Sequence, residues 1–86
     1  MKIICIDDEP LILNMTVALC RELPAKPEVC GFSNAKDALS WLEDHTADIA
    51  LLDINLPDMN GIELAARIRE TDPNISIIFL GSLVKR

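Results

Sequence analysis

The sequence predicts an α/β fold with a parallel sheet, and three observations lead to this prediction. Short apolar runs typical of buried strands lie at residues 3–6, 49–52 and 75–80. Helical patterns with short connections separate the strands, an order that calls for parallel strands and right-handed crossovers. Two of the runs stop at carboxylates, at Asp7 and at Asp53. In open α/β sheets this end of a strand is where ligands bind.

Length and composition allow one small domain with an aliphatic core, because only 3% of the 86 residues are aromatic. The formal net charge of −6 argues against nucleic acid and anionic membranes as partners. No apolar run is long enough to span a bilayer, and Met1-Lys2 leads into a strand-like run and not a signal peptide. We therefore expect a cytoplasmic protein, in which Cys5, Cys20 and Cys30 are small buried hydrophobes.

The first helix is expected to begin at about residues 9–11, because acidic residues stabilise a helix N-terminus and Pro10 is tolerated in the first turn. It should stop before Pro24. Its buried face is predicted to be Leu11, Met15, Ala18 and Leu19. Residues 28–32 then alternate between polar and apolar, as in a half-exposed strand at a sheet edge.

Ser33-Asn34 is the expected N-cap of a second helix. The spacing of its apolar residues predicts a buried face of Ala35, Ala38, Leu39 and Leu42. Trp41 is interpreted as partly packed surface, and His45 as a solvated residue at the helix end.

A third helix is expected after Gly61, and Pro73-Asn74 should end it. Its predicted apolar stripe is Ile62, Ala65 and Ile68. The fourth strand, residues 75–80, is apolar apart from Ser76.

The stretch 51–61 is the centre of the functional hypothesis. Asp53 should sit at the carboxyl end of a strand buried on both faces, with a loop following it. Pro57 and Asn60-Gly61 mark this loop, in which we expect at least one position with a positive φ. Taken alone, the same pattern also fits an Asp that merely ends a strand and forms a turn.

A flavodoxin-like doubly wound sheet, with strand order 2-1-3-4, would place the acidic residues 7–9 next to Asp53. One acid would be enough to cap the helix that follows, and three are present. Carboxylates that converge repel one another, and a hard cation such as Mg²⁺ would offset their negative charge. An Asp in this position can also act as a nucleophile toward a phosphoryl group.

Three motifs in this order resemble the receiver domain of bacterial two-component response regulators. They are Asp7-Asp8-Glu9-Pro10, the stretch 51–61 (Leu-Leu-Asp-Ile-Asn-Leu-Pro-Asp-Met-Asn-Gly) and residues 77–80 (Ile-Ile-Phe-Leu). The resemblance covers essentially residues 1–80. It implies a phosphoacceptor signalling domain and not an enzyme with an external substrate.

The resemblance also implies roles for individual residues. Asp53 would accept a phosphoryl group from the phosphohistidine of a sensor histidine kinase. Asp8, Asp53 and the backbone carbonyl of Asn55 would bind Mg²⁺, and Asp7 would act through a water. The remaining positions are Glu9, a further acid of less defined role, and Pro57 and Gly61, which would shape the loop.

The chain departs from the family after the fourth strand. Receivers usually place Ser or Thr directly after that strand, but this sequence has Gly81 there, and Ser82, the candidate switch hydroxyl, one residue later. The family continues with a further helix, a strand carrying an essential lysine, and a last helix, and Lys85 cannot be equated with that lysine. Residues 1–86 are therefore interpreted as a receiver domain truncated after its fourth strand, family-like over residues 1–80 and with an atypical tail, residues 81–86.

Three functional hypotheses follow. The first is a receiver domain of two-component phosphorelay signalling whose phosphorylation is impaired by truncation. The second is an aspartyl-phosphate phosphatase, but the haloacid dehalogenase type needs a second Asp where Asn55 stands. The third is an interaction or dimerisation module that works without phosphorylation. We also expect a homodimer, joined through the exposed edge of the strand 75–80.

Overall fold

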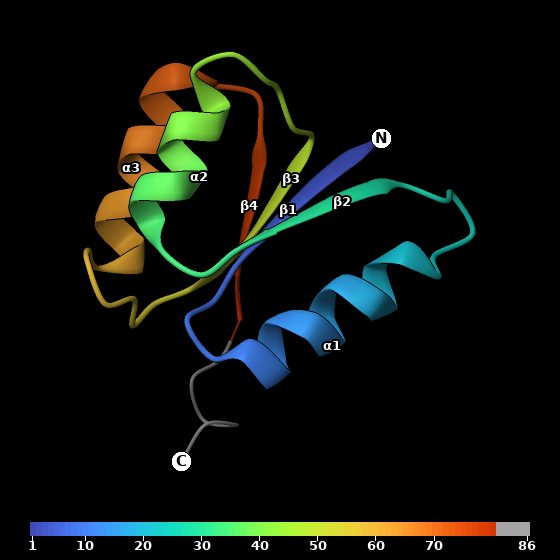
Figure 1. Cartoon of the computed structure of the whole chain (residues 1–86). Helices are drawn as coiled ribbons and strands as arrows, with labels where there is room; N and C mark the ends of the chain where they lie inside the picture. The colour runs from blue at the N-terminus through green and yellow to red at the C-terminus, as the bar shows by residue number, and fades with distance from the viewer. Residues whose placement is uncertain (81–86) are drawn as a thin grey trace.

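The computed structural model describes residues 1–80, which alternate between strand and helix along the whole length. The strands pair in parallel in the order β2-β1-β3-β4, so the predicted fold and strand order are confirmed (Figure 1). No helix within these residues combines the length and apolarity needed to cross a membrane. The elements are β1 (Lys2–Ile6), α1 (Pro10–Arg21), β2 (Glu28–Phe32), α2 (Ala35–Leu42), β3 (Ile49–Asp53), α3 (Gly61–Thr71) and β4 (Ser76–Leu80).

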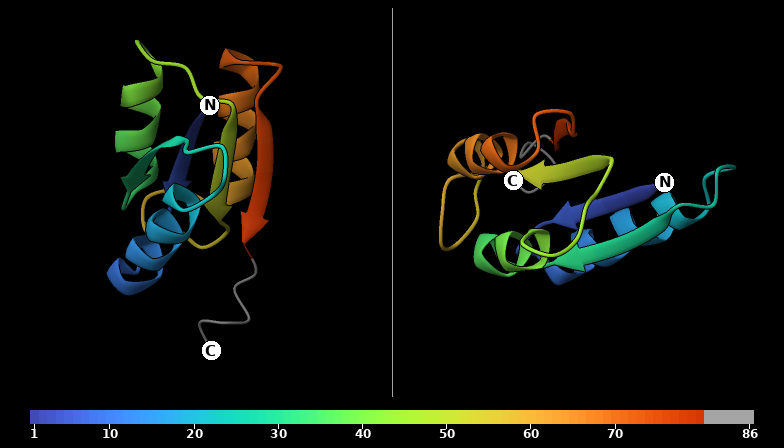
Figure 2. Two further views of the ribbon diagram at one scale, coloured as in Figure 1. Left: turned by 90° about the vertical axis from the view of Figure 1, so that its right-hand side faces the viewer. Right: turned by 90° about the horizontal axis from the view of Figure 1, so that it is seen from above.

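The sheet separates two apolar layers. Helices α2 and α3 lie on one side of it and α1 lies on the other (Figure 2). Because side chains alternate along a strand, the central strands supply both layers. Ile4 and Leu52 belong to the core under α2 and α3, whereas Ile3 and Cys5 belong to the smaller core under α1. Burial of Cys5 raises the pKa of its thiol to about 12, which makes it a poor nucleophile.

The predicted buried face of α1 is wrong. Leu11, Met15 and Leu19 are 77%, 60% and 68% exposed, and Ala18 is exposed as well. The helix instead turns Leu13, Val17 and Cys20 toward the sheet. The reason lies in β2, where Gly31 has no side chain: a Cβ there would meet Val17 Cγ2 at 3.1 Å and Leu13 Cδ1 at 3.2 Å.

The predicted face of α3 is partly wrong, whereas that of α2 is confirmed. In α3, Ile68 is buried but Ile62 is 62% exposed, and Leu64 takes the core position instead. The i, i+4 pair Leu64 and Ile68 therefore faces the sheet. In α2, three of the four predicted residues are buried and Leu39 packs partly buried against the same core.

Strand β4 is an outer strand of the sheet formed by the described residues. It pairs with β3 over its whole length, from Ser76 beside Ile49 to Leu80 beside Asp53. Ile78 and Phe79 are 49% and 40% exposed, so β4 presents apolar side chains to solvent.

Candidate metal centre

Three carboxylates meet at the carboxyl edge of the sheet. Asp7 directly follows β1, Asp53 is the last residue of β3, and these strands are neighbours in the middle of the sheet. Parallel strands end at the same edge, so the loop after β1 is brought to the end of β3. One carboxylate oxygen from each of Asp7, Asp8 and Asp53 lies within 4.8 Å of the others. The predicted convergence is confirmed.

The backbone holds two of these side chains in place. Asp7 is 2% exposed, and its Oδ1 accepts a hydrogen bond of 2.9 Å from the backbone N–H of Glu9. Its own backbone N–H donates to the carbonyl of Phe32 at the end of β2. Asp53 is 1% exposed, and its Oδ1 accepts a bond of 3.3 Å from the backbone N–H of Asn55. Asp8, the third carboxylate of the group, is exposed to solvent.

The arrangement fits a small, hard divalent cation. Oxygens that bind one Mg²⁺ lie about 2.1 Å from it and therefore at most about 4.2 Å from each other. In an octahedral site adjacent ligand oxygens lie about 3 Å apart, so the three observed oxygens, within 4.8 Å of one another, would have to move closer together when the ion binds. Two of the three carboxylates are buried, and drawing like charges together in a site of low dielectric is costly without a cation. The donor set consists only of oxygens, as Mg²⁺ prefers.

The loop after Asp53 closes back on the strand that it leaves. The backbone N–H of Gly61 donates to the carbonyl of Ile54 over 2.7 Å, and Asn55 pairs with Asn60 in an isolated bridge. The prediction of a positive φ in this loop is wrong, because within residues 1–80 only Lys26 has one. Gly61 is required by close packing instead: a Cβ on it would lie 2.3 Å from the backbone oxygen of Asp53.

Asp58, in the same loop, has a role that the sequence did not reveal. Its carboxylate accepts hydrogen bonds from the backbone N–H groups of Ala35 and Lys36, at 3.0 and 2.9 Å, and so caps α2 from a distance in sequence. The N–H of Ala35, followed by that of Lys36, lowers the pKa of the Asp58 carboxyl below its ordinary value. A Pro-Asp pair in a loop is typical of an ordinary turn, so no local sequence pattern predicted this contact.

The other predicted positions fall into two groups. Pro57 and Asn55 lie in the exposed part of the loop, and Glu9 is exposed and contributes its backbone N–H to Asp7. Gly81, Ser82 and Lys85 lie outside the described residues.

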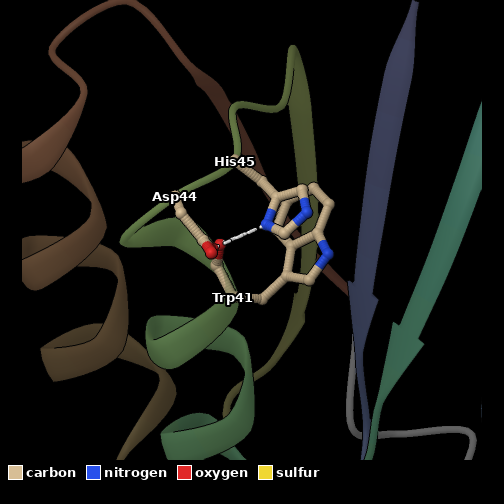
Figure 3. A network of polar contacts seen from close by, with 3 residues as sticks. All are labelled: Trp41, Asp44 and His45. Atoms are coloured by element: carbon tan, nitrogen blue, oxygen red, sulfur yellow. Dashed lines mark hydrogen bonds and ion pairs between the residues drawn. The ribbon is translucent and has the colours of Figure 1, made fainter.

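A second polar cluster lies at the other end of α2. His45 stacks on Trp41 and its Nδ1 points toward the carboxylate of Asp44 (Figure 3). The two ring centroids are 4.3 Å apart, and Nδ1 lies 2.8 Å from Oδ1 of Asp44. The same nitrogen lies 2.8 Å from the carbonyl oxygen of Trp41, so it carries a proton and donates to these oxygens. A cavity of about 500 Å³ opens beside Asp44 and His45. It is also lined by Lys2, at the start of β1, and is therefore remote from the three carboxylates.

Known proteins match most of the chain. The family model described as response regulator receiver domain matches residues 3–85. The transcriptional regulatory protein LytR of Staphylococcus aureus is 42% identical over 79 residues, which cover 92% of this chain and 32% of that protein. An uncharacterised response regulatory protein of Vibrio cholerae, VC_A0850, is 37% identical over 75 residues, which cover 86% of this chain and 29% of that protein. The chain thus spans about a third of the length of these relatives.

Solved structures share the fold. The response regulator TrrA of Thermotoga maritima, in complex with Mg²⁺ and BeF, superposes with a TM-score of 0.86 at 28% identity, covering 98% of this chain and 71% of that one. RcsB of Salmonella enterica serovar Typhimurium, bound to a promoter in the presence of phosphomimetic BeF₃⁻, gives a TM-score of 0.83 at 26% identity, covering 95% and 69%. The match over residues 3–85, the sheet order and the acidic edge agree. The chain belongs to the response regulator receiver domain family of two-component signal transduction.

Proposed function

We propose that Asp53 accepts a phosphoryl group from the phosphohistidine of a sensor histidine kinase, with Mg²⁺ in the site. Asp8, Asp53 and the backbone carbonyl of Asn55 hold the ion, and Asp7 acts on it through a water. The observation that carries this proposal is the convergence of Asp7, Asp8 and Asp53 within 4.8 Å at the end of β3. The complex of TrrA with Mg²⁺ and BeF supports it, since that relative binds the same kind of ion.

The transfer is a nucleophilic substitution at phosphorus. A carboxylate oxygen of Asp53 attacks, the phosphorus–nitrogen bond of the phosphohistidine breaks, and the leaving imidazole takes a proton from solvent. The product is an acyl phosphate on Asp53. When bound, Mg²⁺ offsets the negative charge of the phosphoryl oxygens. The chain's own contribution is to position Asp53, whose carboxylate is oriented by the N–H of Asn55 and whose backbone is packed against Gly61.

Mg²⁺ together with beryllofluoride, a mimic of the phosphoryl group, provides the test. We expect saturable binding by the chain, seen as a protein-bound ¹⁹F NMR signal, and no bound signal with Asp53→Asn. Glu70→Gln is the matched control, because Glu70 is an exposed acid near the far end of α3. A bound signal that survives Asp53→Asn would assign the site to another residue.

The chain acts in this proposal as a signalling domain and not as an enzyme with an external substrate. Its partner is the sensor kinase, and its charge of −6 does not favour direct binding to nucleic acid by this segment. Cys5, Cys20 and Cys30 are free thiols, which suits a reducing cytoplasm.

A second candidate function is an interaction module that dimerises without phosphorylation. It is favoured by the outer position of β4 among the strands of residues 1–80 and by the exposure of Ile78 and Phe79. An apolar outer strand is a template for pairing with another chain, and two copies of β4 can pair antiparallel across a two-fold axis. We propose that the 86-residue chain forms a homodimer in this way.

A further inference from the structure

Asp58 joins two regions of the fold that lie far apart in the sequence. It stands in the loop after Asp53, and its two carboxylate oxygens accept hydrogen bonds from Ala35 and Lys36, 23 and 22 residues earlier. These N–H groups belong to the first turn of α2, where a helix has no partners of its own for them. The third N–H, that of Asp37, is satisfied locally by the side chain of Asn34 at 2.8 Å.

The loop that carries Asp58 is also tied to Asp53. At its beginning, the N–H of Asn55 donates to Oδ1 of Asp53. At its end, Gly61 donates to Ile54 and is packed against the backbone of Asp53. Asp58 therefore lies between two fixed points, the carboxylate of Asp53 and the N-terminus of α2. If Oδ1 of Asp53 changes its hydrogen-bond partner, either this short loop changes its conformation or the N-terminus of α2 moves.

We propose that Asp58 is a positioning residue that couples the occupancy of the carboxylate site to the N-terminus of α2. This inference rests on the proposed function, because it requires that an ion binds at Asp53. When Mg²⁺ binds, the hydrogen bond from Asn55 to Asp53 readjusts and the loop moves with it. The two hydrogen bonds that Asp58 accepts then transmit the movement to Ala35 and Lys36. Coupling between two sites is reciprocal, so removing the cap must also change the affinity for Mg²⁺.

Comparing the local cap, Asn34, with Asp58 distinguishes coupling from an effect on helix stability alone. Asn34 and Asp58 cap the same turn of the same helix, but Asn34 follows β2, and within residues 1–80 its side chain forms hydrogen bonds with Asp37. Loss of either cap destabilises α2. Only loss of Asp58 removes the hydrogen bonds between the helix and the loop that follows Asp53.

The experiment titrates MgCl₂ into the chain and its variants and follows backbone amide signals by NMR. In the unmodified chain we expect Asn55, Ala35 and Lys36 to shift with one common midpoint. In Asp58→Ala the signal of Asn55 still shifts, with about fivefold weaker Mg²⁺ affinity, near the lower end of usual couplings. The shifts of Ala35 and Lys36 are then lost. Asp58→Asn, which keeps the shape of the side chain, covers the case in which Asp58→Ala does not fold.

Asn34→Ala should leave both the Mg²⁺ affinity and the response of Lys36 in place, although it lowers the unfolding temperature. Equal weakening of Mg²⁺ binding by Asn34→Ala and Asp58→Ala would overturn the inference, because helix stability alone would then explain it. Unchanged shifts of Ala35 and Lys36 in both Asp58 variants would overturn it as well. If no amide shifts at all, including that of Asn55, the proposed function fails and the inference falls with it.

Discussion

Gly61 lies directly against the backbone of Asp53, so closely that a Cβ built on it would stand 2.3 Å from the Asp53 carbonyl oxygen and 2.8 Å from Cα of Ile54. Neither atom belongs to a flexible side chain that could move aside. The first residue of α3 and the last residue of β3 are therefore in direct contact. This contact explains why the loop needs glycine although its φ is not positive.

Gly61→Ala is expected to destabilise the chain by about 1–3 kcal/mol, since overpacking against backbone has this cost. It should also weaken Mg²⁺ binding, because relief of the clash displaces Asp53. Urea unfolding and a Mg²⁺ titration measure the two effects. Gly31→Ala is the control: its Cβ would meet side chains of Val17 and Leu13 at 3.1 and 3.2 Å, which can yield. Equal losses for both variants would contradict this account.

The cap formed by Asp58 should make a pH-dependent contribution to stability. Its carboxyl pKa is lowered in the folded chain from an ordinary value of 3.8, so the stabilisation is present above that value and is lost as the pH falls through the folded pKa. The difference in unfolding free energy between the chain and Asp58→Asn is therefore expected to be larger at pH 7 than at pH 3. A difference that stays constant or grows toward acid would show that the cap does not depend on the charge.

Phosphorylation of Asp53 in the 86-residue chain by acetyl phosphate should be slow. Gly81 stands where receivers usually carry a hydroxyl. Fixed groups that meet developing charge are a major source of catalysis, and loss of one costs roughly a hundredfold in rate. Intact-mass measurements over time, beside a receiver that carries this hydroxyl, give the comparison. Addition of one phosphate to each chain at an equal rate would disprove the prediction.

Dimerisation through β4 predicts that the chain sediments as a dimer at micromolar concentration. Burial of ~400 Å² of apolar surface yields about 10 kcal/mol before the costs of association. Ile78→Lys places a charge on the proposed interface and should give monomers. Leu11→Lys, at a residue of α1 that is 77% exposed, should leave the dimer intact. Monomers of the unmodified chain that unfold independently of concentration would rule the dimer out.

The strands and their acidic ends could be predicted because they follow from local patterns, whereas the order 2-1-3-4 was supposed for a flavodoxin-like sheet and agreed with the resemblance to receiver domains. Apolar runs that end in Asp7 and Asp53 identify strands and their carboxyl ends without any knowledge of packing. The buried face of α1 could not be predicted in this way. Apolar residues lie on most sides of this helix, and the choice among them was decided by the gap at Gly31, on another strand.

The contact between Asp58 and α2 was missed for a related reason. A cap supplied from 22 residues away leaves no periodic signal in either segment, and Asn34 already satisfied the expectation of a local N-cap. The positive φ expected in the loop was wrong because glycine serves two purposes, conformational freedom and close approach. Sequence alone does not distinguish them, whereas the distance from Gly61 to Asp53 does.

The most direct test of the central claim, that the three carboxylates form a metal site built on Asp53, is the affinity for Mg²⁺ of the chain and two variants. Backbone amide shifts measured by NMR can follow the titration. We predict weak, saturable binding that is reduced by both Asp8→Asn and Asp53→Ala, while Glu70→Gln binds like the unmodified chain. An affinity that Asp53→Ala leaves unchanged would contradict the account.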